Sequence, residues 1–248
     1  MGWWVALHQM DRIRSQQLVE QTRTCKDMAE LMAGELGHSL QQVDQTLQGL
    51  TALLHTQGAA SAFQATRAQG ALALGVFQQI SLVNLQGQVL YSSDPQAVGS
   101  SLAEKPYFKE RRATDADQTQ VWSMEIDPRL GSWVVPVTRR VDGRAGRFEG
   151  TVVTLVALDA FLHHFKSLRL TGGSEQLLLQ SDGSSIVGVQ GGNILLGEQA
   201  QSFGSREFSQ QWQAKASGRY RSPVDGVERF FSVRQVPGFP LRVMHAVP

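Results

Sequence analysis

The chain has 248 residues, which is enough for one large domain or two domains of ordinary size. With 42% hydrophobic and 18% charged residues it has the composition of a globular protein, which excludes a disordered or fibrous chain. The net charge of +1 lacks the strong basic excess of nucleic-acid-binding proteins, so no nucleic-acid partner is expected.

One long helix is predicted over residues 11–57, which contain no proline. Mostly apolar residues recur there at alternating steps of three and four, which keeps one seam on one side of a helix. The seam comprises Leu18, Thr22, Cys25, Ala29, Met32, Leu36, Leu40, Val43, Leu47, Leu50 and Leu54. At ~1.5 Å per residue the helix would span roughly 65–70 Å, more than the width of one small domain. It fits either a core-facing or coiled-coil helix, or a spine that carries mechanical or dimerisation signals along stacked domains.

The chain begins with a short apolar segment that contains Trp3 and Trp4. Paired tryptophans at the head of a helix are typical of the water-facing end of a transmembrane segment. A cloning remnant or a hydrophobic staple fits the segment equally well. No run of about eighteen apolar residues is present, so the chain as given is not expected to span a membrane. Cys25 is the only cysteine, which excludes an intrachain disulfide and any site built from clustered cysteines.

The next part of the chain reads as a short helix followed by an antiparallel sheet. A helical pattern covers residues 61–75, and a loop with a short helix covers residues 101–114. Strands are predicted at residues 79–84, 89–93, 120–124, 132–141 and 146–158. Pro136 lacks an N–H group, so its strand should lie at a sheet edge or carry a bulge. Asp159 then opens a helix that runs to about residue 168.

The last part of the chain repeats this pattern in a shorter form. Strands at 176–180 and 185–189 are followed by a helix-like stretch at 205–216 and strands at 218–224, 227–236 and 241–247. Two modules of hairpin, helix and antiparallel hairpin therefore follow the long helix. This order of elements predicts an α+β fold.

An ordered set of short motifs runs through nearly the whole chain. The set comprises Ser92-Ser93-Asp94-Pro95 with Gly99 and Leu102, Glu104-Lys105-Pro106-Tyr107-Phe108, Trp133 before Thr138-Arg139-Arg140, Asp142-Gly143, Phe148-Glu149-Gly150-Thr151-Val152-Val153, Leu158-Asp159 before Phe161, Leu179 to Gly183, and Phe239-Pro240-Leu241-Arg242-Val243. Over residues 31–247, the order and spacing of these motifs resemble the double Cache or PDC sensor domains. Those domains are the extracytoplasmic parts of bacterial diguanylate cyclases, histidine kinases and chemoreceptors.

The resemblance implies that the long helix packs along two PAS-like modules. The helices would occupy residues 1–75, a membrane-distal ligand-binding module residues 76–169, and a membrane-proximal module residues 170–248. It also implies a periplasmic location, a second transmembrane helix beyond Pro248, and a cytoplasmic output domain, with a diguanylate cyclase as the first expectation. The apolar seam adds the expectation of a homodimer formed through the N-terminal helix.

The resemblance also suggests where a ligand would bind. In this family the small-molecule pocket usually lies in the distal module, between the sheet and the loops that cover it. Tyr107 matches the tyrosine of the family's Arg-x-Tyr-Phe motif, and its neighbour Phe108 should pack. Lys105 stands where the family has arginine. A lysine offers a single flexible charge in place of a bidentate fork for a carboxylate.

The strand at residues 132–141 supplies further candidates. Trp133 and Arg139 lie on one face, and Thr138 and Arg140 lie on the other, because side chains alternate along a strand. If the first face lines the pocket, Trp133 is an aromatic wall and Arg139 a carboxylate-binding fork. Otherwise Trp133 is a core residue, and the arginines form solvated or interdomain salt bridges.

Three more residues carry two interpretations each. Trp122 is either a pocket wall or a core residue. Arg111, one turn beyond Tyr107, either lines the pocket mouth with Arg112 or faces solvent. Asp159 either meets an amine group of the ligand or caps the helix that it opens.

No pattern in the sequence indicates catalysis. His163 and His164 are consecutive, so on a helix they point about 100° apart and cannot chelate one metal as residues four apart would. We therefore expect no enzymatic activity, no metal and no cofactor.

The predicted function is an extracytoplasmic sensor domain that binds a small polar, anionic or amino-acid-like molecule, such as an organic acid or an amino acid. The alternative is a dimerisation or interaction module without a small-molecule ligand, which answers to a partner protein or to the membrane.

Overall fold

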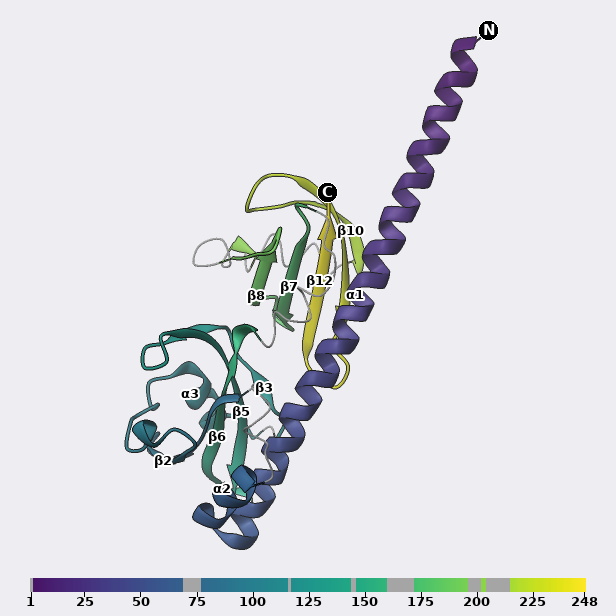
Figure 1. The fold of residues 1–248 in the computed structure, drawn as a ribbon. Helices are drawn as coiled ribbons and strands as arrows, with labels where there is room; N and C mark the ends of the chain where they lie inside the picture. Colours follow the sequence, from purple (N-terminus) through teal and green to yellow (C-terminus); the bar gives the residue numbers. More distant parts are fainter. Residues whose placement is uncertain are drawn as a thin grey trace. The chain divides into compact units, whose positions relative to one another are not determined.

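The computed structural model describes residues 2–68, 77–115, 117–143, 146–159, 172–195, 202–203 and 215–248. Within these residues one long helix and two antiparallel sheets are present, which confirms the predicted α+β class (Figure 1). The chain divides into two compact units. The central unit is His38–His163, and the terminal unit is Met1–Gly37 with His164–Pro248.

The predicted long helix is α1, Gly2–Gln57, and it contributes residues to both units. Its seam is observed from Cys25 to Leu50, where every predicted seam residue is at most 3% exposed. Leu54 is half-buried and Thr22 is exposed, so the seam is shorter than predicted. The helix ends where Gly58 adopts a φ of 78°, a backbone conformation that glycine reaches without steric cost. No helix among the described residues is long and apolar enough to cross a membrane.

The terminal unit contains a six-stranded antiparallel sheet in the order β10-β11-β12-β7-β8-β9. Its strands are β7 Glu175–Gln180, β8 Ser185–Gln190, β9 Asn193–Ile194, β10 Ser217–Arg221, β11 Glu228–Gln235 and β12 Leu241–Val247. One face of the sheet packs on the first part of α1, where the Cys25 thiol donates to the carbonyl oxygen of His245 at 3.0 Å. Burial raises the pKa of that thiol to about 12. The opposite face carries an apolar cluster that includes Leu177, Tyr220 and Phe231.

A buried ion pair joins two strands of the terminal unit. Arg229 and Glu175 are 1% and 0% exposed, and their charged atoms lie 3.2 Å apart. Glu175 also accepts hydrogen bonds from Ser222 at 2.6 Å and from the Tyr220 hydroxyl. Arg229 holds the pKa of Asp225 at about 2, well below its usual range. Because the buried carboxylate is fully hydrogen-bonded, the network fixes the β10-β11 hairpin against β7.

The central unit contains a sheet in the order β2-β1-β6-β5-β3, with β4 paired to β5 beside β3. Its strands are β1 Phe77–Asn84, β2 Val89–Ser92, β3 Gln120–Val121, β4 Glu125–Asp127, β5 Ser132–Asp142 and β6 Phe148–Ala157. Its helices, besides the end of α1, are α2 Ala59–Ala68, the 3-10 turn η2 Pro95–Ala97 and α3 Pro106–Ala113. Figure 1 shows α3 beside β5 and β6, with which it is in contact.

Pro136 lies in β5, which is an internal strand and not an edge strand. The pairing of β5 with β6 has no bulge at Pro136. The missing N–H of Pro136 is tolerated because no strand pairs with β5 at this point on that side, which lies between β3 and β4. Trp122, between these two strands, donates its backbone N–H to the Pro136 oxygen at 2.9 Å. The strand predicted at residues 120–124 is therefore shorter, since β3 has only two residues and a connecting segment follows it. The strand β4 was not predicted.

Several predicted elements lie outside the described residues. These are the end of the helix at 61–75, the helix beyond Asp159 with His163 and His164, most of the helix-like stretch at 205–216, and residues 144–145 of one turn. The remaining predicted strands are present with bounds shifted by at most three residues, and β12 has the predicted bounds.

The buried seam gives a first prediction. Leu47 on α1 is 0% exposed, whereas Leu31 on the same helix is 48% exposed. Leu47→Ala is expected to lower the free energy of unfolding by about 2–5 kcal/mol, because it leaves a cavity in the core. Leu31→Ala, the matched control, should change it by less than about 0.5 kcal/mol. Urea denaturation followed by circular dichroism measures both, and equal effects would contradict the packing described.

A second prediction concerns His245, whose burial lowers its pKa to about 4 from a usual value of 6.5. Below pH 6.5 the His245 imidazole is protonated in the unfolded chain but stays neutral in the folded chain. The free energy of unfolding should therefore fall as the pH drops from about 6.5 to about 4. The loss is expected to reach at most about 3 kcal/mol. In His245→Asn, the difference in unfolding free energy between pH 7 and pH 4.5 should be smaller than in the wild type. An unchanged difference would show that His245 does not titrate in this way.

Candidate functional site

The sheet of the central unit has two faces with different neighbours. The face that we call the α3 face carries Val134, Val153 and Leu155, which cluster with Tyr107 and Phe108 of α3. The face that we call the α1 face carries Arg139, which is bonded to Asp44 of α1. Since side chains alternate along a strand, Thr138 and Arg140 lie on the α3 face with Val134.

An aromatic pair covers the α3 face. Proline at the first helical position favours the start of α3 at Pro106, and the helix then turns Tyr107 and Phe108 inward. The Tyr107 and Trp122 rings lie 6.2 Å apart and tilted, and Trp122 Nε1 donates to Thr138 Oγ1 at 2.9 Å. Tyr107 is 3% exposed, and Trp122 is half-buried against the same cluster. The two rings therefore form one wall over the sheet, and Thr138 fixes the orientation of the indole.

A lysine and a glutamate border this wall. The Lys105 ammonium, just before α3, lies 2.9 and 2.8 Å from the two carboxylate oxygens of Glu125 on β4. Both side chains are about a third exposed, so the pair is reachable from solvent. Lys105 therefore has a counter-ion within the unit, and an incoming anion would compete with Glu125.

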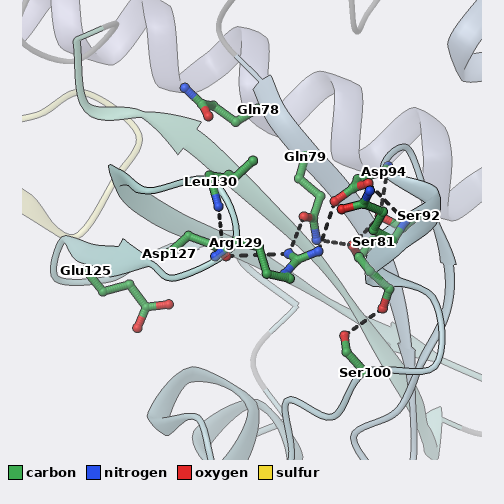
Figure 2. Close-up of polar contacts among 12 residues, drawn as sticks. Gln78, Gln79, Ser81, Ser92, Asp94, Ser100, Glu125, Asp127, Arg129 and Leu130 are labelled. Atoms are coloured by element: carbon green, nitrogen blue, oxygen red, sulfur yellow. Dashed lines mark hydrogen bonds and ion pairs between the residues drawn. The ribbon is translucent and has the colours of Figure 1, made fainter.

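An arginine that the sequence analysis did not single out lies at the centre of a second polar group. Arg129 donates to Asp94 Oδ2 at 2.9 Å and to Gln79 Oε1 at 2.6 Å, and its guanidinium lies 3.5 Å from Asp127 Oδ2. Figure 2 shows Arg129 between Asp127 on one side and Gln79 with Asp94 on the other. Gln79 is 3% exposed and passes the network on to Ser81 on the same strand.

The local sequence explains how Arg129 is held. Asp127 Oδ1 accepts the backbone N–H groups of Arg129 and Leu130 at 2.9 and 3.0 Å, which closes the turn between β4 and β5. Leu130 then packs against the cluster that contains Tyr107. The aspartate at the head of this turn is a signal from which the turn could have been predicted. Nothing in the sequence alone indicated that the arginine reaches Gln79 and Asp94.

The electrostatics of Tyr107 link the two polar groups to the aromatic wall. Burial raises the pKa of the Tyr107 hydroxyl above its usual range, and the nearby carboxylates of Glu125 and Asp127 raise it further, while Arg129 opposes them. The phenol therefore stays protonated at neutral pH and is available as a hydrogen-bond donor. Charges of both signs lie close enough to this tyrosine to act on its ionisation.

Arg111 lies behind the wall and is 0% exposed, so the solvent-facing interpretation is wrong for this residue. Its Nε donates to Thr138 Oγ1 at 3.1 Å, and its Nη2 donates to the Gln118 oxygen. Burial lowers its pKa to about 10, so it still carries its charge at neutral pH. Arg112, its neighbour, is exposed. A role for Arg111 at a pocket mouth stays a prediction.

Two predicted residues lie on the other side of the sheet. Arg139 contacts Asp44 at 3.0 Å and Asp117 at 2.9 Å on the α1 face, opposite Tyr107. The structure thus gives the salt-bridge alternative for Arg139, and Trp133 lies half-buried on the same face. Arg140, on the α3 face, lies 4.9 Å from the centre of the Phe148 ring and pairs with Asp142. A carboxylate-binding fork formed by Arg139 stays a prediction, and it would lie on the face away from Tyr107.

Asp159 is exposed at the start of a helix whose continuation lies outside the described residues. Its contact with an amine stays a prediction. Of the predicted site residues, the structure brings together Lys105, Tyr107 and Trp122, with Arg111 behind them. The described residues contain no group of three or more His, Cys, Asp or Glu positioned to hold a metal.

Comparison with known proteins gives the following. A family model described as Cache domain matches residues 10–248. No curated protein matches the chain in sequence. Among solved structures, the extracellular domain of rpHK1S-Z16, which has been assigned to the histidine kinases, is similar at 22% identity. The alignment covers 94% of each chain and has a TM-score of 0.73.

Two chemoreceptor domains are also similar in fold. The ligand-binding domain of CtaA from Pseudomonas fluorescens, in complex with L-alanine, is 16% identical with a TM-score of 0.64, over 89% of this chain and 94% of that one. The ligand-binding domain of PctB from Pseudomonas aeruginosa PAO1, in complex with L-Arg, is 17% identical with a TM-score of 0.65, over 89% of this chain and 92% of that one.

The third prediction tests the packing behind the aromatic wall. Thr138 is 0% exposed and accepts from the half-buried Trp122 and the buried Arg111, so Thr138→Val leaves both donors without this acceptor. The free energy of unfolding should fall by about 1–3 kcal/mol. Thr56→Val removes an exposed hydroxyl on α1 and should change stability by less than about 0.5 kcal/mol. Equal effects in urea denaturation would count against the contacts described.

Proposed function

The chain belongs to the Cache domain family, and from this premise we propose that it senses a small zwitterionic molecule, an L-amino acid, at the α3 face of the central unit. In this proposal the chain is the periplasmic part of a bacterial membrane receptor. Residues 76–169 form its membrane-distal, ligand-binding module, and residues 170–248 form its membrane-proximal module.

One observation carries the proposal. Charges of both signs, in the Lys105–Glu125 pair and in Arg129 with Asp94 and Asp127, border a single aromatic wall. A zwitterion needs a cation for its carboxylate and an anion for its ammonium group, a few ångströms apart. An organic acid would leave the carboxylates at this border without a partner, which disfavours it.

Each residue has a role in this proposal. Lys105 exchanges Glu125 for the ligand's carboxylate, and Glu125 with Asp127 receives the ammonium group. Tyr107 and Trp122 cover the aliphatic part of the ligand, and the protonated phenol donates one hydrogen bond. The complexes of CtaA with L-alanine and of PctB with L-Arg support an amino acid as the ligand class, because both domains share this fold.

Binding would be transmitted through a change of partners. A ligand shifts a conformational equilibrium only if its affinity differs between the two states. Breaking the Lys105–Glu125 pair would release the start of α3 from β4, and that is the differential contact we propose. The signal would then pass through the N-terminal helix of a homodimer, anchored in the membrane, to a cytoplasmic output domain. A diguanylate cyclase is our proposed output, and the sequence of the whole receptor tests that part.

A second function, a dimerisation or interaction module without a ligand, is favoured by a different observation. Lys105 and Arg129 already have carboxylate partners within the unit, and Trp122 already packs on Tyr107. A site satisfied in this way does not require a guest. The two functions differ in whether any small molecule binds.

The fourth prediction separates them. Isothermal titration of the chain with L-amino acids, matched carboxylic acids and matched amines should give binding by amino acids only. Lys105→Met should weaken that binding by roughly tenfold or more, because a charge-assisted hydrogen bond is lost. Arg112→Met removes an exposed charge two turns away and should leave the affinity unchanged. If none of the amino acids binds, the interaction module is favoured. If the carboxylic acids bind as tightly as the amino acids, the proposal of a zwitterionic ligand is wrong.

A further inference from the structure

A hollow lies in the central unit, on the α1 face of the sheet and thus on the side away from Tyr107. It has a volume of about 170 Å³ and lies between the end of α1, the start of α2 and the strands β1, β2, β5 and β6. A protein cavity of about 150 Å³ suffices to bind benzene. The hollow therefore has room for a small organic molecule, and the function proposed above makes no use of it.

Three leucines that the fold leaves incompletely covered line part of this hollow, beside polar residues such as Asn84 and Glu149. Leu54 of α1 and Leu82 of β1 are half-buried, and Leu90 of β2 is 45% exposed. Val141 of β5 adds a further apolar surface. A guest that covers these side chains removes apolar surface from water at about 25 cal/mol per Å², which favours a guest with a short aliphatic part.

One carboxylate, that of Glu149, lies among the described residues that line the hollow. Among the described residues that line it, Glu149 and His55 are the ionisable ones, and both are exposed. Glu149 forms no hydrogen bond or ion pair with any residue in the described part of the chain. An anion entering the hollow would meet the negative charge of Glu149.

A glycine explains where the Glu149 carboxylate lies. A Cβ atom at Gly143 would fall 1.7 Å from Glu149 Oε1, so any side chain at position 143 would displace the carboxylate. Gly143 has no positive φ in the structure, so it is not required there by the conformation of its backbone. The missing side chain at position 143 leaves the space that the carboxylate occupies.

We propose that this hollow binds a small organic cation, a primary ammonium group on a short aliphatic chain. The ammonium group pairs with Glu149 at the rim, and the aliphatic chain lies on Leu54, Leu82 and Leu90. This site is separate from the one beside Tyr107. It binds cations in preference to carboxylates. Its existence does not depend on the function proposed above.

The experiment compares three probes of one shape with different head groups: 3-methylbutylamine, 3-methylbutanol and 3-methylbutanoate. Methyl NMR of the chain, with the leucine methyl groups labelled, should show saturable shifts at Leu82 and Leu90 with the amine. The alcohol should bind more weakly and the acid should cause no shift. Glu149→Gln should weaken amine binding by roughly two- to fivefold, since a solvent-exposed ion pair is lost. Because Glu149 is exposed, this variant should fold normally.

Two further variants sharpen the test. Gly143→Ala should also weaken amine binding, because the new methyl group displaces the carboxylate. Glu228→Gln makes the same charge change at an exposed position of the terminal unit and should leave the affinity as it was. Equal shifts with the amine and the acid, amine binding that Glu149→Gln does not change, or no saturable shift with the amine would each overturn the proposal.

Discussion

The burial of one helix seam is the constraint on which both units depend. Each sheet has one apolar face that its own strands and short helices do not cover, and in each unit that face packs on residues of α1. Cys25, Ala29 and Met32 serve the terminal unit, and larger leucines such as Leu40 and Leu47 serve the central unit. Since one continuous helix contributes to both cores, neither core is complete without it.

In our proposal the ligand binds on the α3 face of the central unit, which α1 does not cover. The apolar cluster there is small, and its border is made of ionised side chains that pair with one another. Pairs of this kind contribute little to stability when they are partly exposed. Such ion pairs can exchange partners, because a ligand with matching charges replaces one side chain of the pair without leaving the other unpaired. The hollow on the opposite face of the same unit is lined by one carboxylate, Glu149, and by leucines, so we propose different chemistry for the two faces.

The fold was readable from the sequence because its signals are periodic. The seam of α1 and the alternation in the strands follow from residue spacing, and they fix the α+β class. Arg111 could also have been placed, since it lies four residues after Tyr107 and thus on the same side of α3. The position of Arg139 relative to α3 could not be predicted, because alternation separates two faces of β5 without saying which one α3 covers. Glu125 and Arg129 were missed for another reason: β4 has three residues, too few for a period, and Arg129 reaches side chains far away in sequence.

The surroundings of Cys25 have a practical consequence. Its thiol is buried, donates to a backbone oxygen of β12, and ionises only near pH 12 because of burial. Thiolates, not thiols, react with maleimides and iodoacetamides. New cysteines placed on exposed positions can therefore be labelled with spin or fluorescent probes while the native cysteine is left in place. Distances between such probes can then follow each unit in solution without any change to the core.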